Sequence, residues 1–269
     1  MRTSIYLLLA SLLFVGCNDK KEREAPIEIT EETTEMMTES SKMLDNFSVT
    51  PISHATMVLQ WDGKVFYIDP VGGATAFDGQ PDADAVLITD IHGDHFNMET
   101  LTAVAGEGVP IIAPQAVADK IDAGLQPQVT VLNNGATEQF RVLRGFTFEA
   151  VPMYNLREEA KKFHTKGRGN GYLIYKNSDK VYISGDTEDI PEMRSLQNID
   201  VAFVCMNLPY TMTVESAAGA VNDFKPAKVY PYHYRGADGL HDVAKFKQLV
   251  NNASPEVEVI QLNWYPNRD

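Results

Sequence analysis

Cysteine and positive charge are both scarce in this sequence of 269 residues. Its 2 cysteines cannot build a disulfide framework. Lys and Arg together number 23 against 37 Asp and Glu, which gives a formal net charge of −14. That balance argues against a nucleic-acid-binding protein that works through a basic face. Hydrophobic residues make up 44% and charged residues 22% of the chain, which is ordinary for a globular protein and excludes a collagen or a wholly disordered chain.

The first 17 residues have the layout of a secretory signal. Arg2 precedes an apolar run from Ile5 to Val15, which is too short to span a bilayer. The run leads into Phe14–Cys17, which resembles the bacterial lipobox, whose cysteine is acylated and becomes the new N-terminus. We therefore predict a lipoprotein signal peptide over residues 1–16 and a lipid on Cys17 that anchors the protein to the membrane of the cell envelope, facing the periplasm or the cell surface. An ordinary signal peptide with an incidental cysteine is the alternative.

Residues 17–46 are rich in Glu and Thr and offer little apolar surface to bury. They predict a flexible acidic tether, with a short surface helix as the alternative. From residue 47 the pattern changes to short apolar strands and amphipathic helices, so residues 47–269 are predicted to form one domain. Hairpins alternate with αβ units along this domain, which predicts a layered α/β fold with two mixed sheets.

Several element boundaries can be predicted from turn and cap residues. Asp62-Gly63 predicts a tight hairpin between two apolar strands. Thr213 is expected to cap a helix that begins at Val214. We also expect helices over Pro114–Ala123 and Leu240–Asn251 and a strand over Glu138–Leu143.

Candidate metal ligands follow the short buried strand Ala85–Thr89. Asp90, His92, Asp94 and His95 stand within six residues, and Gly93 allows the tight turn that lets side chains on both sides converge. Imidazole and carboxylate groups gather in this way mainly to hold metal ions. A solvated loop with chance histidines is the alternative.

The cluster resembles the HxHxDH motif of the metallo-β-lactamase superfamily, with Asp90 in place of the first histidine. Two later segments resemble that superfamily's bridging aspartate and its final histidine, namely Gly185-Asp186-Thr187 and the run around His233. The opening Ser53-His54-Ala55, followed by a hairpin and Asp69-Pro70, is similar to the branch that includes L-ascorbate-6-phosphate lactonase and enzymes of the N-acylphosphatidylethanolamine phospholipase D type. The resemblance spans roughly residues 48 to 264 and implies a four-layer αββα sandwich.

The resemblance also implies two metal sites, which this sequence fills unequally. The second site has all its expected ligands, which are Asp94, His95, Asp186 and His233. At the first site Asn155 stands where the superfamily has its third histidine, beside Asp90, His92 and the shared Asp186; His164, nine residues later, could replace Asn155. We expect Zn²⁺, with Mn²⁺ or Fe²⁺ as alternatives, bound as one or two ions, and a weaker or altered first site because it is oxygen-rich.

The activity that the resemblance implies is metal-assisted hydrolysis of an ester, lactone or phosphodiester bond in a small or lipid-like substrate. Two cations would activate a water, and Asp94 would orient it and take its proton. The alternative is a binding or scaffold lipoprotein that kept the fold but lost most of its activity, and Asp90 and Asn155 keep that alternative open.

Substrate-binding candidates lie on loops near these ligands. The basic glycine-rich segment 164–171 predicts a loop that meets an anionic substrate, although a plain hairpin-entry loop is equally compatible. Tyr234 and Arg235 flank the last ligand and are expected to shape the pocket, whereas His241 is expected at the surface. The side chains that we expect to bind substrate are His54, His164, Lys166, Arg168, Tyr210 and Tyr232.

Overall fold

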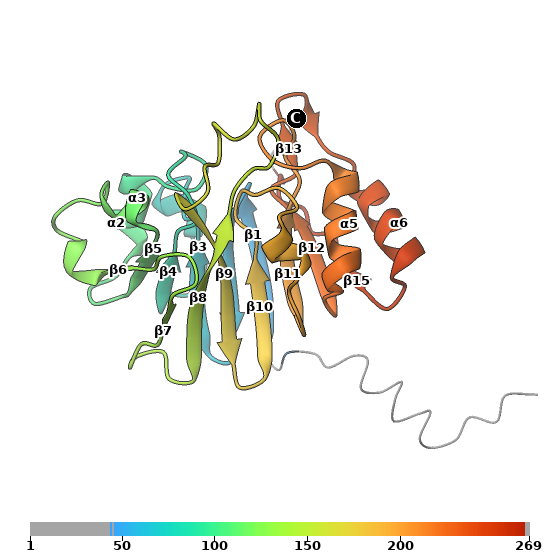
Figure 1. Ribbon diagram of the computed structural model, residues 1–269. Coiled ribbons are helices and arrows are strands. Elements are labelled where there is room, and N and C mark those ends of the chain that lie inside the picture. Colours follow the sequence, from blue (N-terminus) through green and yellow to red (C-terminus); the bar gives the residue numbers. More distant parts are fainter. Residues whose placement is uncertain (1–43, 45, 267–269) are drawn as a thin grey trace, which may run out of the picture.

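The computed structural model describes residue 44 and residues 46–266 (Figure 1). The predicted signal peptide, the predicted lipid-attachment site Cys17 and nearly all of the predicted tether lie outside the described residues. Among the described residues, no helix is both long enough and apolar enough to cross a bilayer.

Two mixed β-sheets stand face to face at the centre of the domain (Figure 1). The first has the order β1 (Phe47–Ser53), β2 (Thr56–Trp61), β3 (Lys64–Ile68), β4 (Ala85–Leu87), β5 (Ile111–Ala113) and β6 (Val129–Val131). The second has the order β15 (Glu258–Val259), β12 (Lys228–Tyr232), β11 (Val201–Cys205), β10 (Asp179–Ile183), β9 (Gly169–Lys176), β8 (Phe146–Met153) and β7 (Thr137–Glu138). A small hairpin of β13 (Arg235–Gly236) and β14 (Gly239–Leu240) stands apart from both.

Short helices cover the outer face of each sheet (Figure 1). The first sheet carries η1 (Ala74–Phe77), α2 (Met98–Val104), α3 (Gln115–Ala118) and η2 (Gln126–Gln128). The second carries α4 (Pro191–Arg194), α5 (Val214–Phe224) and α6 (Val243–Ala253). The predicted four-layer αββα sandwich is therefore confirmed.

Alternation along the strands explains why the first sheet is buried on both faces. In β2, Met57 and Leu59 belong to the core between the sheets, whereas Val58 points to the other face. That other face packs against Leu101 of α2 and Val117 of α3. Since successive side chains of a strand point to opposite faces, a wholly apolar strand is what a layer covered on both sides requires.

Sheet topology brings the ends of several strands to one edge. In the first sheet β3 and β4 are parallel, so the segments after Ile68 and Leu87 leave the sheet together. In the second sheet β10, β11 and β12 are parallel, and β8 runs in the same direction because both β8 and β10 are antiparallel to β9. Functional loops therefore gather at this edge, as is usual where parallel strands end.

Three predicted elements differ from the structure. The strand expected over Glu138–Leu143 is wrong beyond Glu138, because a turn with a 2.9 Å bond from Leu143 N to Phe140 O replaces it. The helix expected over Pro114–Ala123 ends at Ala118. The helix expected over Leu240–Asn251 begins only at Val243, because the side chain of Asp242 caps it with a 2.9 Å bond from Lys245 N. The Thr213 cap is confirmed by a 3.1 Å bond from Ser216 N.

Candidate metal centre

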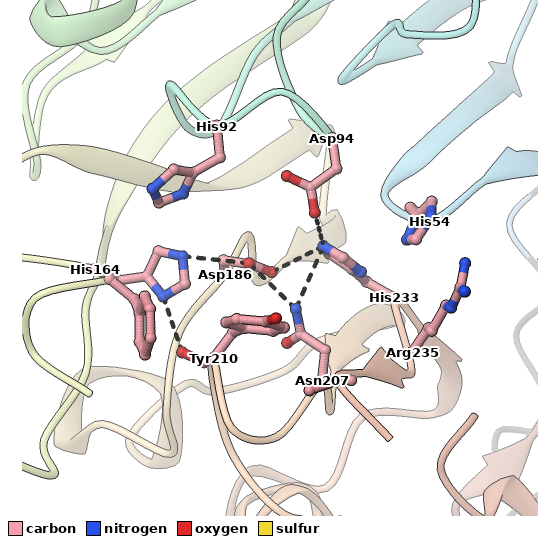
Figure 2. A pocket seen from close by; sticks show the side chains of 12 residues that line it. His54, His92, Asp94, His164, Asp186, Asn207, Tyr210, His233 and Arg235 are labelled. Carbon is pink, nitrogen blue, oxygen red and sulfur yellow. Dashed lines mark hydrogen bonds and ion pairs between the residues drawn. The ribbon is translucent and has the colours of Figure 1, made fainter. Parts of the chain in front are cut away.

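Imidazole and carboxylate groups from several loops meet at one edge of the two sheets (Figure 2). The Nε2 atoms of His95 and His233 lie 3.2 Å apart. Asp186 stands between them, with Oδ2 3.4 Å from His95 Nε2 and Oδ1 3.4 Å from His233 Nε2. Asp94 approaches from the opposite side, with Oδ2 3.2 Å from His233 Nε2. The four ligands predicted for the second site are therefore brought together.

Asp69 fixes the orientation of His95 from behind. Its Oδ2 lies 2.8 Å from His95 Nδ1, and its Oδ1 accepts a 2.7 Å hydrogen bond from Thr89 N. All three side chains are fully buried. When Nδ1 donates its proton to a carboxylate, the lone pair of Nε2 remains for a metal ion, and such outer partners raise metal affinity. Asp69 was named in the sequence only as part of the Asp-Pro pair, and this role was missed.

A second group consists of Asp90, His92 and His164, whose ligand atoms lie within 4.8 Å of one another. His92 Nδ1 is 2.5 Å from Asp90 Oδ2. His164 Nε2 is 3.3 Å from Asp186 Oδ2 and 3.8 Å from Asp90 Oδ2, so Asp186 lies beside both groups. The predicted bridging position of Asp186 agrees with this placement.

Asn155 lies behind His164 rather than in front of it. Its Nδ2 donates to the carbonyl oxygens of Ala160 and Tyr210, at 2.9 and 2.7 Å. The Nδ1 atom of His164 lies 3.1 Å from the same Tyr210 oxygen. These contacts favour the His164 tautomer with its proton on Nδ1, and the lone pair of Nε2 is then left to bind a cation. We therefore predict His164 as the third ligand beside Asp90 and His92. The buried Oδ1 of Asn155 accepts no hydrogen bond, so Asn155 remains the alternative ligand.

The loop that carries His164 is clamped onto the rest of the site. The buried carboxylate of Glu188 accepts bonds from Leu156 N at 2.8 Å and Arg157 N at 2.9 Å, and it pairs with Arg157 Nε at 2.5 Å. Arg157 Nη2 in turn donates to Pro209 O and Thr211 O, at 3.0 and 2.8 Å. Nothing in the sequence pattern singles out Glu188, because its partners come from distant loops.

The electrostatics of the buried cluster fit divalent cations. Burial acts to raise the pKa of Asp186, but the charges of His233 and His95 outweigh burial and hold that pKa well below its usual range. Burial acts to lower the pKa of His95, yet Asp186 and Asp69 raise it well above the usual value. Protonated His95 thus balances the negative charge of Asp186 and Asp69, a role that a bound metal cation would otherwise fill. Buried Oδ1 atoms of Asp90 and Asp186 also accept no hydrogen bond, as expected of ligand atoms.

A cavity of about 480 Å³ opens above these groups. Three of the predicted substrate-binding residues line it, namely His54, His164 and Tyr210. The ring of His54 packs edge-on against Tyr265 and His233, with centroids 5.2 and 5.5 Å away. His54, His233 and Asp69 all have positive φ values, of 50°, 46° and 46°. Such uncommon backbone conformations in residues other than glycine are typical of functional sites.

The other three predicted substrate-binding residues lie elsewhere. Lys166 Nζ pairs with Glu192 at 2.8 Å and stands over the ring of Tyr154, outside the cavity. Arg168 Nη2 pairs with Asp90 Oδ2 at 3.2 Å. Tyr232 is fully buried in the core against Phe203 and Trp264. The expectation that Tyr232 contacts substrate is therefore corrected, because it is a core residue. Lys166 and Arg168 do not line the cavity, and their contact with substrate stays a prediction.

Two residues of the cavity wall, Asn207 and Phe163, were missed at the level of sequence. Asn207 Nδ2 lies 3.3 Å from Asp186 Oδ2 and 3.4 Å from His233 Nε2. Thr211 Oγ1 donates to Asn207 Oδ1 and so holds the amide with its donor side toward Asp186. The segment containing Asn207 follows a buried strand, which is the signal that could have identified it.

The fold, the two ligand groups and the motif order together define a protein of the metallo-β-lactamase fold. A family model described as "Beta-lactamase superfamily domain" matches residues 65–234. A "UPF0173 metal-dependent hydrolase" of Thermococcus onnurineus is 30% identical over 222 residues, which cover 78% of this chain and 94% of that relative. The chain belongs to the β-lactamase superfamily and, within it, to the UPF0173 family.

Similar proteins come from several organisms. A UPF0173 metal-dependent hydrolase of Lysinibacillus sphaericus is 27% identical, over 77% of this chain and 93% of that protein. The crystal structure of a Parabacteroides distasonis protein, provisionally named a metal-dependent hydrolase, has a TM-score of 0.71 and 36% identity, covering 81% of this chain and 94% of that one. A metallo hydrolase of Ignicoccus hospitalis, with a TM-score of 0.67 and 24% identity, covers 80% of this chain and 94% of its own and shares the fold.

Proposed function

We propose that the protein is a metal-dependent hydrolase that cleaves an ester, lactone or phosphodiester bond in a small or lipid-like substrate. The observation that carries this proposal is the convergence of His95 Nε2, His233 Nε2 and Asp186, with the first two only 3.2 Å apart. Two imidazoles and a carboxylate whose ligand atoms converge in this way form a typical donor set for a divalent metal ion. The names of the UPF0173 relatives support the same reaction class.

Divalent cations held by these groups supply Lewis acidity and an activated water. Zn²⁺ is the ion we propose, with Mn²⁺ or Fe²⁺ as alternatives, because His-rich sites with carboxylates take all three. The second site would use Asp94, His95, Asp186 and His233, and the first would use Asp90, His92, His164 and Asp186. Both sites open onto the same cavity.

Within the protein, Asp94 is the group placed to handle the proton. Its side chain is 40% exposed, whereas Asp186, which lines the same cavity, is buried. Burial acts to raise its pKa, but the hydrogen bond from His233 and the charge of His95 keep that pKa well below its usual range. Asp94 is therefore ionised and would accept a hydrogen bond from the attacking water. Its low pKa makes it a weak base, so it would take a proton only from a water that a bound cation has made acidic. Asn207 and Asp69 hold Asp186 and His95 in position.

A panel of phosphodiesters and lactones, assayed with and without added Zn²⁺ or Mn²⁺, tests this function. Wild-type protein should show metal-dependent turnover that Asp94→Asn removes, while Asp122→Asn, an exposed aspartate outside the cavity, leaves it intact. The Arg168–Asp90 pair favours a second candidate, a binding or scaffold protein with little activity. Absence of metal-dependent turnover on every substrate, with metal bound, would support that candidate instead.

The proposal includes membership of the branch that contains L-ascorbate-6-phosphate lactonase and the N-acylphosphatidylethanolamine phospholipase D type enzymes. The opening His54 segment and Asp69-Pro70 support it. In the structure these two segments meet the metal centre, His54 at the cavity wall and Asp69 behind His95. Substrates of either type, a sugar-phosphate lactone or a lipid phosphodiester, belong in the panel above.

The proposal also includes a lipid on Cys17 that holds the protein at the cell envelope, with a small-molecule or lipid-like substrate and no nucleic-acid partner. The apolar run Ile5–Val15 and the lipobox-like Phe14–Cys17 support the anchor. The net charge of −14 argues against nucleic acid. Labelling with a clickable fatty acid in cells should modify the wild-type protein and leave Cys17→Ser unlabelled and absent from the membrane fraction.

A further inference from the structure

The cavity has two unlike walls on opposite sides of the metal centre. In Figure 2, Arg235 lies beyond His233, on the side of His54, whereas Tyr210 lies between His164 and Asn207. The ring of Phe163 packs edge-on against that of Tyr210, with centroids 5.3 Å apart, and both line the cavity. Tyr210 keeps 38% of its surface exposed although it is a large apolar ring. One wall is therefore cationic and the other aromatic.

Arg235 is presented from a braced hairpin. It begins β13, which pairs with β14 so that Arg235 lies opposite Leu240. The hairpin is seated on the 207–211 loop, because a Cβ at Gly236 would overlap the carbonyl oxygen of Leu208. His241 fastens the other arm, with Nε2 3.1 Å from Leu208 O and its backbone N donating to Tyr234 O at 2.8 Å. The guanidinium thus projects from a fixed base.

The charge of Arg235 is also available to a ligand. Arg157, Arg168 and Arg194 each pair with a carboxylate, of Glu188, Asp90 and Asp189 respectively. Within residues 46–266, Arg235 has no carboxylate oxygen within 4.0 Å. It is the only lysine or arginine among the described residues that line the cavity. Lys166, the other cation expected to meet substrate, is already paired with Glu192.

We propose that the substrate is an anionic amphiphile whose carboxylate or phosphate group binds Arg235 and whose apolar group packs on Tyr210 and Phe163. The hydrolysed bond then lies between the two groups, above Asp94 and Asp186. A guanidinium binds either anion through paired hydrogen bonds, and an exposed aromatic pair at a cavity wall favours an apolar or aryl group. The volume of about 480 Å³ is within the range of small-molecule sites. This inference rests on the proposed function, since it names that site's substrate class.

Binding of non-hydrolysable probes to the metal-loaded protein tests the inference without any need for turnover. The probes are 3-phenylpropionate, 3-phenylpropylphosphonate and neutral 3-phenylpropanol, together with inorganic phosphate, each titrated calorimetrically. The variants are Arg235→Met, Tyr210→Ala and the control Arg144→Met, an exposed arginine outside the cavity. Metal content is measured for every variant, so that lost binding is not confused with lost metal.

Arg235→Met should weaken binding of the two anionic phenyl probes by at least about tenfold and leave phenylpropanol unchanged. Tyr210→Ala should weaken all three phenyl probes but not inorganic phosphate. The comparison of propionate with phosphonate identifies which anion the site prefers. The proposal would be overturned if Arg235→Met and Arg144→Met bound both anionic probes equally well. It would also be overturned if Arg235→Met lost as much affinity for phenylpropanol as for the anionic probes. A protein that binds the probes as expected yet hydrolyses nothing would contradict the proposed function alone.

Discussion

The Nη2 atom of Arg168 lies 3.2 Å from Oδ2 of Asp90, the carboxylate that stands where the metallo-β-lactamase motif has its first histidine. Asp90 is fully buried, and the two residues are 78 positions apart in the chain. The guanidinium therefore offsets the charge that the aspartate brings to the first site. Its positive charge also opposes a cation bound beside Asp90. We therefore expect the two groups of candidate ligands to differ in metal affinity.

Replacement of Arg168 by glutamine should strengthen metal binding at the weaker site. We expect its affinity to rise by about tenfold, a change of about 1.4 kcal/mol, with the tighter site unchanged. The metal-free variant should be less stable than wild type, because the buried Asp90 loses its arginine partner and keeps only the imidazoles of His92 and His164. Titration calorimetry with Zn²⁺ and thermal denaturation measure both effects. Lys166→Gln, on the same loop but paired with the partly exposed Glu192, is the control. Unchanged affinity at both sites would contradict this role of Arg168.

Asp69→Asn should weaken the second metal site. The carboxylate lies 2.8 Å from His95 Nδ1 and keeps the Nε2 lone pair directed at the site. An amide can present its NH₂ group instead, which favours the tautomer that is protonated on Nε2. Loss of such an outer partner lowers metal affinity by about 10- to 100-fold. Competition with a chromophoric chelator measures this affinity.

Asp84→Asn is the matched control for Asp69→Asn. Asp84 also accepts a backbone hydrogen bond, from Val65 N at 2.9 Å, and pairs with Lys64 at 2.7 Å, but it lies away from the cavity. Its replacement should cost some stability and leave metal affinity at the wild-type value. If both variants bind zinc like wild type, Asp69 has no orienting role.

The parts of this site that could be predicted from sequence are those carried by local patterns. The order of hairpins and αβ units predicted a layered α/β fold with two mixed sheets, and the motif residues His92, Asp94 and His95 were predicted because they follow one strand closely. Long-range pairing could not be predicted this way. Arg168 was expected to meet substrate, but whether a cation faces solvent or a buried carboxylate 78 residues away depends on the tertiary structure.

Tyr232 and His164 show the same limit. Tyr232 shares a strand face with Tyr230, and both belong to the core between the layers. His233 follows in a left-handed conformation with φ of 46°, so its side chain leaves the strand pattern while Tyr232 keeps it. That Tyr232 is next to a predicted ligand in the sequence therefore did not show where its side chain points. His164 lies beside Asp90 and His92 because the 154–168 loop folds back, with Asn155 N bonded to His164 O at 2.9 Å.

Removal of metal should lower thermal stability. Asp90 and Asp186 are buried, and Asp94 lies beside them, so without a cation their charges are balanced only by imidazoles and Arg168. A ligand present at about 100 times its dissociation constant stabilises the folded state by roughly 2.7 kcal/mol, which corresponds to a Tm change of about 5–10 °C for a domain of this size. Differential scanning calorimetry before and after treatment with EDTA measures the change.

Two controls accompany the chelation experiment. EDTA already saturated with Zn²⁺ should have no effect on Tm. Asp186→Asn, which removes the carboxylate shared by both ligand groups, should unfold at the same temperature with and without free EDTA. A Tm of the wild-type protein that does not respond to chelation, in a sample shown to have lost its metal, would mean that metal and fold are uncoupled.

Gly236→Ala should loosen the hairpin that carries Arg235. A Cβ at this position would overlap Leu208 O and crowd His241 Nε2, so the hairpin must lift from the 207–211 loop. Overpacking of this kind costs about 1–3 kcal/mol. Gly124→Ala is the control, because no heavy atom lies within 4 Å of its Cβ and its φ is not in the left-handed region. Denaturant unfolding should show a loss of stability in Gly236→Ala alone. Binding of 3-phenylpropylphosphonate should fall as it does in Arg235→Met, because the guanidinium keeps its charge but loses its position. Stability and phosphonate binding equal to those of Gly124→Ala would show that the seating of the hairpin does not position Arg235.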